Sequence, residues 1–288
     1  MLTFSRYWGA PHPVIAMERA IDAAFPDLDR MQPPIDLRKL GERRGIKVVE
    51  RPIDADGLIF RAEDEGYVVV LNTRAQEERR RFTLAHEIAH TFFFDAEGCR
   101  GYETTASRGE VRREVDPEEE HLCDYGAAKI LMPKGLIAPL LDTFGPSAHF
   151  VVQVARTFKV SMRASARHLV KISDTKIVVG YWEYRASRGQ FETSWVEGRE
   201  TAKGRRAMAV GKDQPIFDDF LAAQDFRGRR WMSLGGDLQH YFVDAVFLKG
   251  TPRRWLTEIV LDPIAERGFV GRSTRIAGLS GEVPGHLR

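Results

Sequence analysis

The chain has 288 residues, of which 43% are hydrophobic and 29% are charged, a composition typical of a soluble globular protein. Its 43 basic and 41 acidic residues give a formal net charge of +2, which excludes the strong basic excess of a general nucleic-acid-binding protein. There is no cysteine framework, no apolar segment of signal-peptide length at the amino terminus and no apolar run of bilayer length. We therefore expect a cytoplasmic protein with no membrane partner.

The amino-terminal part predicts two helices followed by a small sheet. Apolar residues recur at helical spacing over residues 14–25, and a second, short helix is expected from residue 35 to about residue 45. Apolar and β-branched runs then predict three strands, over 46–50, 57–61 and 66–71. The last two are joined by an acidic turn, and together the three strands predict a small antiparallel sheet.

A long helix is predicted over residues 75–94, where no proline or glycine interrupts the helical spacing of apolar residues. The polar, glycine-containing stretch 95–119 predicts a long loop. A second helix is predicted over 118–132 and ends before Pro133, because proline cannot continue a helix. Three shorter helices are expected after it, over 134–144, 147–157 and 161–172.

The character of the sequence changes near Ser173, where we place a domain boundary. Beyond it, four segments have residues typical of strands, 177–182, 191–196, 241–248 and 256–261. Segments rich in glycine and arginine, such as 200–206 and 227–230, are expected to be loops between them. The tyrosines and tryptophans of this part are expected to form a core rather than to line a small-molecule pocket.

The predicted helix over 75–94 contains the sequence His86-Glu87-Ile88-Ala89-His90. Residues four apart lie on one face of a helix, so the two imidazoles can bind one metal ion. Glu87 projects beside that ion, where it can take a proton from a bound water, as in zinc peptidases. The alternative is a surface helix with two histidines spaced by chance. The apolar neighbours of the two histidines argue against that alternative, because a buried imidazole pair without a partner is costly. These neighbours are Phe82, Ala85, Ala89 and Phe92.

A catalytic zinc site needs a third protein ligand, and no histidine follows at residues 91–97. The predicted helix over 118–132 is the expected source of this ligand. Its apolar face includes Cys123, which we interpret as a small buried hydrophobe, and Glu120 continues that face toward the start of the helix. This reasoning favours Glu120 but leaves three neighbours open as ligands: Glu119, His121 and Asp124.

Four stretches of the sequence resemble the ImmA/IrrE family of metallopeptidases: residues 34–49, 70–72, 81–90 and 120–133. The last two are specific when they occur together in this order, and the resemblance covers about residues 33–172. It implies that Glu120 completes the metal site. It also implies a bacterial regulator that cleaves helix-turn-helix repressors in response to stress or DNA damage.

Residues 152–169 resemble the helix-turn-helix-like part of the same family. Arg163 and Arg167 would be available to contact DNA, but the near-neutral charge of the chain favours a helical cap over the catalytic cleft. Ser161 is expected to cap the second helix of this part. Family members often carry a tyrosine, able to stabilise an oxyanion, where this chain has Arg167. We therefore treat Arg167 and His168 as candidate oxyanion or substrate contacts.

The fold class predicted from these features is α+β, in three parts. Residues 1–133 are expected to form a zincin-like metallopeptidase domain with a small antiparallel sheet and the metal-binding helix. Residues 134–173 are expected to form a helix-turn-helix-like helical segment, and residues 174–288 a β-rich α+β domain. The family resemblance implies a ligand-sensing role for this last part.

The predicted function is zinc-dependent endopeptidase activity, with a helix-turn-helix repressor as the protein substrate. His86, His90 and Glu120 are the predicted ligands of zinc, although such a site also accepts manganese or iron. Glu87 is the predicted general base, and Asp124 is a candidate to orient an imidazole. Two alternatives remain: a defence or toxin–antitoxin protease with another protein target, and a non-enzymatic, zinc-containing regulator that binds DNA or protein.

Overall fold

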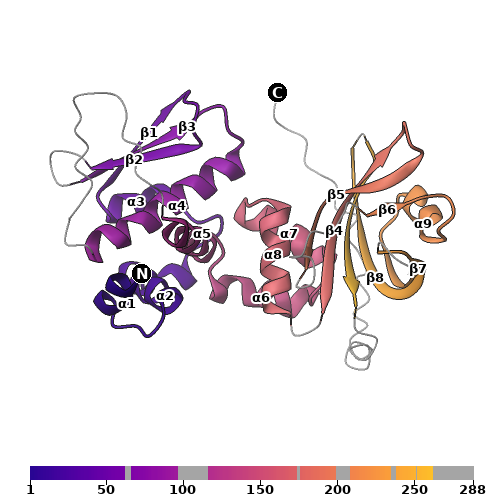
Figure 1. Ribbon diagram of the computed structural model, residues 1–288, viewed down its shortest axis with the longest axis horizontal. Coiled ribbons are helices and arrows are strands. Elements are labelled where there is room, and N and C mark those ends of the chain that lie inside the picture. Colours follow the sequence, from indigo (N-terminus) through magenta and orange to yellow (C-terminus); the bar gives the residue numbers. More distant parts are fainter. Residues whose placement is uncertain are drawn as a thin grey trace. The chain divides into compact units, whose positions relative to one another are not determined.

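The computed structural model describes residues 1–61, 66–96, 116–173, 176–198, 208–234, 238–250 and 252–261. The chain forms two compact units, Met1–Ile172 and Ser173–Arg288 (Figure 1). The helical segment predicted over 134–173 lies, up to Ile172, in the same compact unit as the predicted metallopeptidase part. Most of the loop predicted over 95–119 falls outside the described residues.

The first unit combines a small sheet with a set of helices. Its described strands are β1 (Ile46–Arg51), β2 (Gly57–Arg61) and β3 (Tyr67–Asn72). Its described helices are α1 (Leu2–Tyr7), α2 (Pro13–Ala24), the 3-10 turn η1 (Leu28–Arg30), α3 (Leu37–Arg43), α4 (Glu77–Ala96), α5 (Pro117–Leu131), α6 (Lys134–Phe144), α7 (Ala148–Phe158) and α8 (Met162–Ile172). Helix α1 and the turn η1 have no counterpart among the predicted elements.

The prediction of an antiparallel sheet was wrong for one of its strands. The strand order is β1-β3-β2, with β2 antiparallel to β3 but β1 parallel to β3. Successive strands do reverse direction along the chain, as predicted. The returning strand β3, however, lies between the other two, and this makes β1 and β3 parallel neighbours. Alternating side chains determine which face of a strand is buried, but they carry no information about the order of strands in a sheet.

Helix α4 packs against β2 and β3 and also against α5, so that it lies between the sheet and α5 (Figure 1). Acidic side chains at Glu77 and Glu78 favour the start of α4, because they interact with the positive end of the helix dipole. Helix α5 begins at Pro117, and the side chain of Asp116 caps it by accepting a hydrogen bond from the backbone N–H of Glu118. These two helices carry the predicted metal ligands.

Close approach of α5 to its neighbours depends on Gly126. A Cβ atom at this position would lie 3.0 Å from Cβ of Ala89 on α4 and 3.0 Å from Sδ of Met17 on α2. Glycine therefore lets α5 contact both helices at once. Apolar side chains in and directly after these three helices are buried in the core: Ile21, Phe25, Ile88, Phe92, Ala127 and Ile130.

Helices α7 and α8 are joined by a tight turn, as the sequence predicts. Lys159 ends α7 in the left-handed conformation, with φ 51° and ψ 53°. The Ser161 hydroxyl accepts a hydrogen bond of 3.1 Å from the backbone N–H of Ala164, which confirms the predicted cap of α8. The helical cap favoured for this part stays a prediction, with DNA binding as its alternative.

The second unit is built on a six-stranded sheet with the order β6-β5-β4-β9-β8-β7, in which all neighbours are antiparallel. Its described elements are β4 (Ile177–Arg185), β5 (Gln190–Gly198), β6 (Ala209–Val210), α9 (Ile216–Ala222), β7 (Phe226–Met232), β8 (Gln239–Leu248) and β9 (Arg254–Val260). Trp182 and Trp255 are fully buried and pack with Phe220 of α9, so these tryptophans belong to the core as predicted. Trp231, in contrast, is 49% exposed.

One predicted loop of the second unit is a strand. Residues 227–230 were expected to form an arginine-rich connection, but they lie within β7, which pairs with β8 along its length. The side chain of Arg230 makes an ion pair of 2.7 Å with Asp219 of α9 and lies over the ring of Phe226. These contacts allow a charged side chain at a partly buried strand position. No helix in the described part of the chain is both long and apolar enough to cross a membrane.

Candidate metal centre

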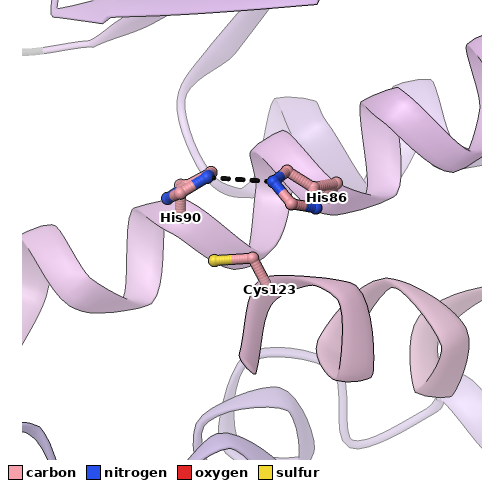
Figure 2. A group of neighbouring side chains, drawn as sticks. All are labelled: His86, His90 and Cys123. Carbon is pink, nitrogen blue, oxygen red and sulfur yellow. Dashed lines mark hydrogen bonds between the residues drawn. The ribbon is translucent and has the colours of Figure 1, made fainter. Parts of the chain in front are cut away.

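The centre is built from facing surfaces of α4 and α5. His86 and His90 lie one turn apart on α4, and both rings point toward α5, as their spacing predicts (Figure 2). The Nε2 atoms of the two imidazoles are 3.1 Å apart. Both side chains are largely buried, with 13% of His86 and 10% of His90 exposed. Two nitrogen donors therefore converge on one point.

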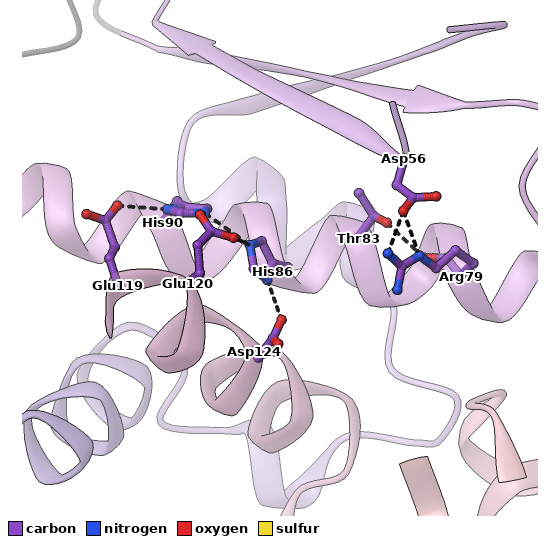
Figure 3. A network of polar contacts seen from close by, with 8 residues as sticks. All are labelled: Asp56, Arg79, Thr83, His86, His90, Glu119, Glu120 and Asp124. Carbon is purple, nitrogen blue, oxygen red and sulfur yellow. Dashed lines mark hydrogen bonds and ion pairs between the residues drawn. The ribbon is translucent and has the colours of Figure 1, made fainter. Parts of the chain in front are cut away.

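Glu120 on α5 supplies a third donor at the same point. One of its carboxylate oxygens lies 3.2 Å from Nε2 of His86, and the other lies 3.3 Å from Nε2 of His90 (Figure 3). Donor atoms bound to one zinc ion at about 2.0–2.1 Å in a tetrahedral arrangement are separated by about 3.3–3.4 Å. The three side chains thus fit a single divalent ion. The Glu120 side chain is 40% exposed, so the centre is open on this side.

The charges of these groups suit metal binding. A hydrogen bond from His90 lowers the pKa of Glu120 and outweighs the opposing effect of burial, so the carboxylate is ionised at neutral pH. Burial lowers the pKa of His90, but hydrogen bonds with Cys123, Glu119 and Glu120 outweigh it and hold the pKa well above the usual value. These groups therefore favour a positive charge at this point, and a divalent cation can provide it.

Cys123 is a competing candidate for the third ligand. Its sulfur and the nitrogens of His86 and His90 lie within 4.8 Å of one another (Figure 2). The thiol is fully buried, however, and burial raises its pKa to about 11. The carboxylate of Glu120 is already ionised, and its oxygens lie 3.2 Å from Nε2 of His86 and 3.3 Å from Nε2 of His90. We therefore favour Glu120 as the ligand and interpret Cys123 as a buried apolar group.

Glu87 lies next to the two histidines on α4 and is 8% exposed. Burial raises the pKa of its carboxyl group, while the charges of His90 and His86 oppose this shift. A carboxylate with a raised pKa is a better proton acceptor near neutral pH than an exposed one. Position and environment thus both suit Glu87 for proton transfer.

The start of strand β2 lies beside Glu87. A Cβ atom on Gly57 would be 3.5 Å from Oε1 of Glu87 and only 2.3 Å from Cγ2 of Thr83. Any larger residue at position 57 would therefore collide with α4. The contact is held by Arg79 of α4, whose Nε donates a hydrogen bond of 3.0 Å to Asp56 just before the strand (Figure 3).

Two carboxylates of α5 contact the outer nitrogens of the imidazoles. Oδ1 of Asp124 lies 2.9 Å from Nδ1 of His86, and Oε1 of Glu119 lies 3.0 Å from Nδ1 of His90 (Figure 3). Asp124 is thus in the place predicted for an orienting group. Glu119, which the sequence left open as a ligand, contacts the side of His90 opposite to Nε2.

Comparisons with known proteins identify a family for part of the chain. Residues 41–169 match the family model of the IrrE N-terminal-like domain, Peptidase_M78. Two relatives are both described as radiation response metalloprotease IrrE, one from Deinococcus radiodurans and one from Deinococcus deserti. Residues 41–169 belong to the ImmA/IrrE family of metallopeptidases.

The similarity to these ImmA/IrrE relatives covers part of each protein. The chain is 33% identical to the D. radiodurans protein over 116 residues, 40% of this chain and 34% of that protein. It is 36% identical to the D. deserti protein over 167 residues, 56% of this chain and 58% of that protein. The chain thus spans about a third of one relative and somewhat more than half of the other. A Mycobacterium tuberculosis transcriptional regulator of known structure has a TM-score of 0.48 and 17% identity, over 96% of this chain and 83% of that one.

The remaining candidates of the ImmA/IrrE unit, Arg167 and His168, both lie on α8. Burial lowers the pKa of His168 to about 4, and the charge of Lys171 adds to this effect. His168 is therefore neutral at physiological pH. A role for either residue at an oxyanion or a substrate stays a prediction.

The contact by which Glu119 can orient His90 was not predicted from the sequence, although the sequence contains a signal for it. Glu119 lies four residues before Cys123, so both occupy the buried face of α5. A carboxylate on a buried helix face requires a hydrogen-bond partner. The helix predicted over residues 75–94, which carries His86 and His90, could have supplied that partner.

Proposed function

We propose that this protein is a metal-dependent endopeptidase, with zinc as the metal it holds. The observation that carries the proposal is the convergence of His86, His90 and Glu120 on one point, with the buried carboxyl group of Glu87 beside it. A purely structural site needs no such neighbouring base. The family of the first unit and the names of its relatives as metalloproteases support the same activity.

The proposed reaction is hydrolysis of a peptide bond. When bound by the two imidazoles and Glu120, the metal would supply Lewis-acid activation of water and of the scissile carbonyl. A carboxylate oxygen of Glu87 accepts a proton from the attacking water as the new C–O bond forms. The same group then gives the proton to the leaving nitrogen as the C–N bond breaks. The buried setting of Glu87, which raises its pKa, favours both transfers.

We propose that the substrate binds as an extended segment along β2. Among the described strands of the first unit, β2 is an outer strand that begins beside Glu87. Outer strands present unpaired backbone groups, which an added peptide strand can use. Leu58 is 44% exposed and Phe60 is 36% exposed. Apolar side chains of the substrate would pack against these two residues.

The target that we favour is a helix-turn-helix repressor cleaved during a stress or DNA-damage response. The family resemblance and the radiation response named for both relatives support this target. A defence or toxin–antitoxin protease would use the same centre on another protein. A non-enzymatic regulator is disfavoured, because burying a carboxylate at position 87 is costly without a catalytic use.

The first test compares wild type with Glu87→Gln. Each protein is purified, its metal content is measured, and it is incubated with the helix-turn-helix repressor encoded nearest its gene. We expect metal in both proteins and cleavage by wild type alone, with the rate in the variant lowered by about 10²–10⁴-fold. Metal in both without cleavage by either would count against this repressor as the substrate. Absence of metal from wild type after reconstitution would contradict the proposed function.

A further inference from the structure

Glu119 is a buried carboxylate next to the metal centre with no part in the reaction described above. Its side chain is 7% exposed, and its Oε1 lies 3.0 Å from Nδ1 of His90. The residue lies in the first turn of α5, one position before the ligand Glu120. Burying a charged group is costly unless it is hydrogen-bonded, and His90 provides such a bond here.

The contact determines which nitrogen of His90 faces the metal. A carboxylate accepts a hydrogen bond, so the proton of the imidazole is held on Nδ1. The lone pair of Nε2 is then directed toward Nε2 of His86 and the carboxylate of Glu120, which are 3.1 and 3.3 Å away. Ring orientation and tautomer are thus both fixed by one side chain of α5.

The corresponding contact at His86 is more exposed. Asp124 lies 2.9 Å from Nδ1 of His86, but its side chain is 59% exposed, against 7% for Glu119. Water can replace an exposed acceptor such as Asp124, whereas it has little access to the Glu119 contact. Hydrogen bonds are also stronger where water is excluded. The two imidazoles are therefore held with unequal strength.

We propose that Glu119 is the main positioning residue of the centre, and that its hydrogen bond to Nδ1 of His90 determines the affinity for the metal. This role rests on the metal centre of the proposed function. It makes α5 the source of three groups of the site: the ligand Glu120 and the two carboxylates that orient the ligands of α4.

The test measures zinc affinity of the full chain by competition with a chromophoric chelator. Loss of an orienting partner typically costs 10–100-fold in metal affinity, so Glu119→Ala should raise the Kd for zinc by about 10–100-fold. Asp124→Ala should raise it by less, because water takes the place of an exposed carboxylate. The matched control is Glu118→Ala, which removes the same charge from the same turn of α5 at an exposed position.

A second measurement follows the Nδ1 proton of His90 by NMR in the zinc-loaded protein. In wild type this proton should exchange slowly and resonate far downfield, because a buried carboxylate accepts it. It should vanish in Glu119→Ala and remain in the control Glu118→Ala. Glu119→Gln keeps the shape and an acceptor oxygen, so it serves if the alanine variant fails to fold. Its His90 proton should move upfield, because a neutral acceptor replaces a charged one.

The outcomes separate this role from the function itself. A zinc Kd for Glu119→Ala within about threefold of wild type would overturn the positioning role alone, since the expected loss of affinity is 10–100-fold. An unmoved His90 proton in Glu119→Gln would also overturn it. Failure of wild type to bind zinc would overturn the metal centre as well. Thermal unfolding of the metal-free proteins checks that each variant is folded.

Discussion

The donors of the metal centre differ from one another in burial and charge, and this difference separates their roles. Glu120 is partly exposed and its pKa is lowered by a hydrogen bond from His90, so it is anionic at neutral pH, as the proposed ligand role requires. Cys123 is fully buried and its pKa is raised to about 11 by that burial. Proximity to the two imidazoles is common to both, so only the protonation states distinguish them.

Substitution of each group tests this assignment. Glu120→Ala should raise the Kd for zinc by more than the 10–100-fold typical of losing an orienting partner, because a direct ligand is lost. Cys123→Ala should change the Kd by less than about threefold, since it removes no ligand. Chelator competition measures both constants. Cobalt-loaded wild type should also lack sulfur-to-metal charge-transfer absorption, and its presence would identify Cys123 as a ligand.

His168 makes stability depend on pH in a specific window. Its pKa is lowered from 6.5 to about 4, mainly by burial, so the unfolded chain binds a proton between these values while the folded chain does not. The free energy of unfolding should therefore fall as the pH drops from about 6.5 to about 4, by up to about 3 kcal/mol.

Denaturant titrations of wild type and His168→Gln across this range measure the effect. Other groups titrate in both proteins, so the difference between the two curves isolates His168. That difference should shrink steadily on acidification and level off below about pH 4. A constant difference would show that His168 has an ordinary pKa.

At the scale of elements, the contact between β2 and α4 places the outer strand beside Glu87. Gly57→Ala should destabilise the protein by about 1–3 kcal/mol and lower peptidase activity, because the new methyl group lies 2.3 Å from Cγ2 of Thr83. Thr83→Ser removes that methyl group but keeps the hydroxyl, which donates to the backbone oxygen of Arg79. The double variant should regain most of the stability, as measured by chemical denaturation. Additive losses would contradict a direct collision.

The helices of the first unit were easier to predict than either sheet. Helix α4 has apolar residues at helical spacing without interruption, and α5 ends where Pro133 requires it. The order of β1, β2 and β3 depends instead on a long-range choice of partner. Strand β7 was missed because Arg230 occupies a partly buried position, where its ion pair with Asp219 replaces apolar contacts. No local pattern reveals a partner eleven residues away.

At the scale of the whole molecule, the sequence predicted the centre better than its surroundings. The convergence of the His86 and His90 imidazoles follows from their four-residue spacing on a helix. The inward face of the helix predicted over 118–132 favoured Glu120 as the third ligand. The sequence places Glu119 on the buried face of α5, but which imidazole it contacts depends on how α5 is rotated against α4. That rotation depends on the close contact of Gly126 with Ala89 and Met17, which involves three separate helices.

The groups that we propose to hold or orient the metal come from two helices, His86 and His90 from α4 and the three carboxylates from α5. A bound ion would therefore act as a cross-link between residues 77–96 and residues 117–131. By thermodynamic linkage, an ion that binds only when these helices are together also holds them together. Loss of the ion and loosening of the two helices thus become parts of one equilibrium. The supply of metal in the cell would set the rigidity of this unit as well as its capacity for catalysis.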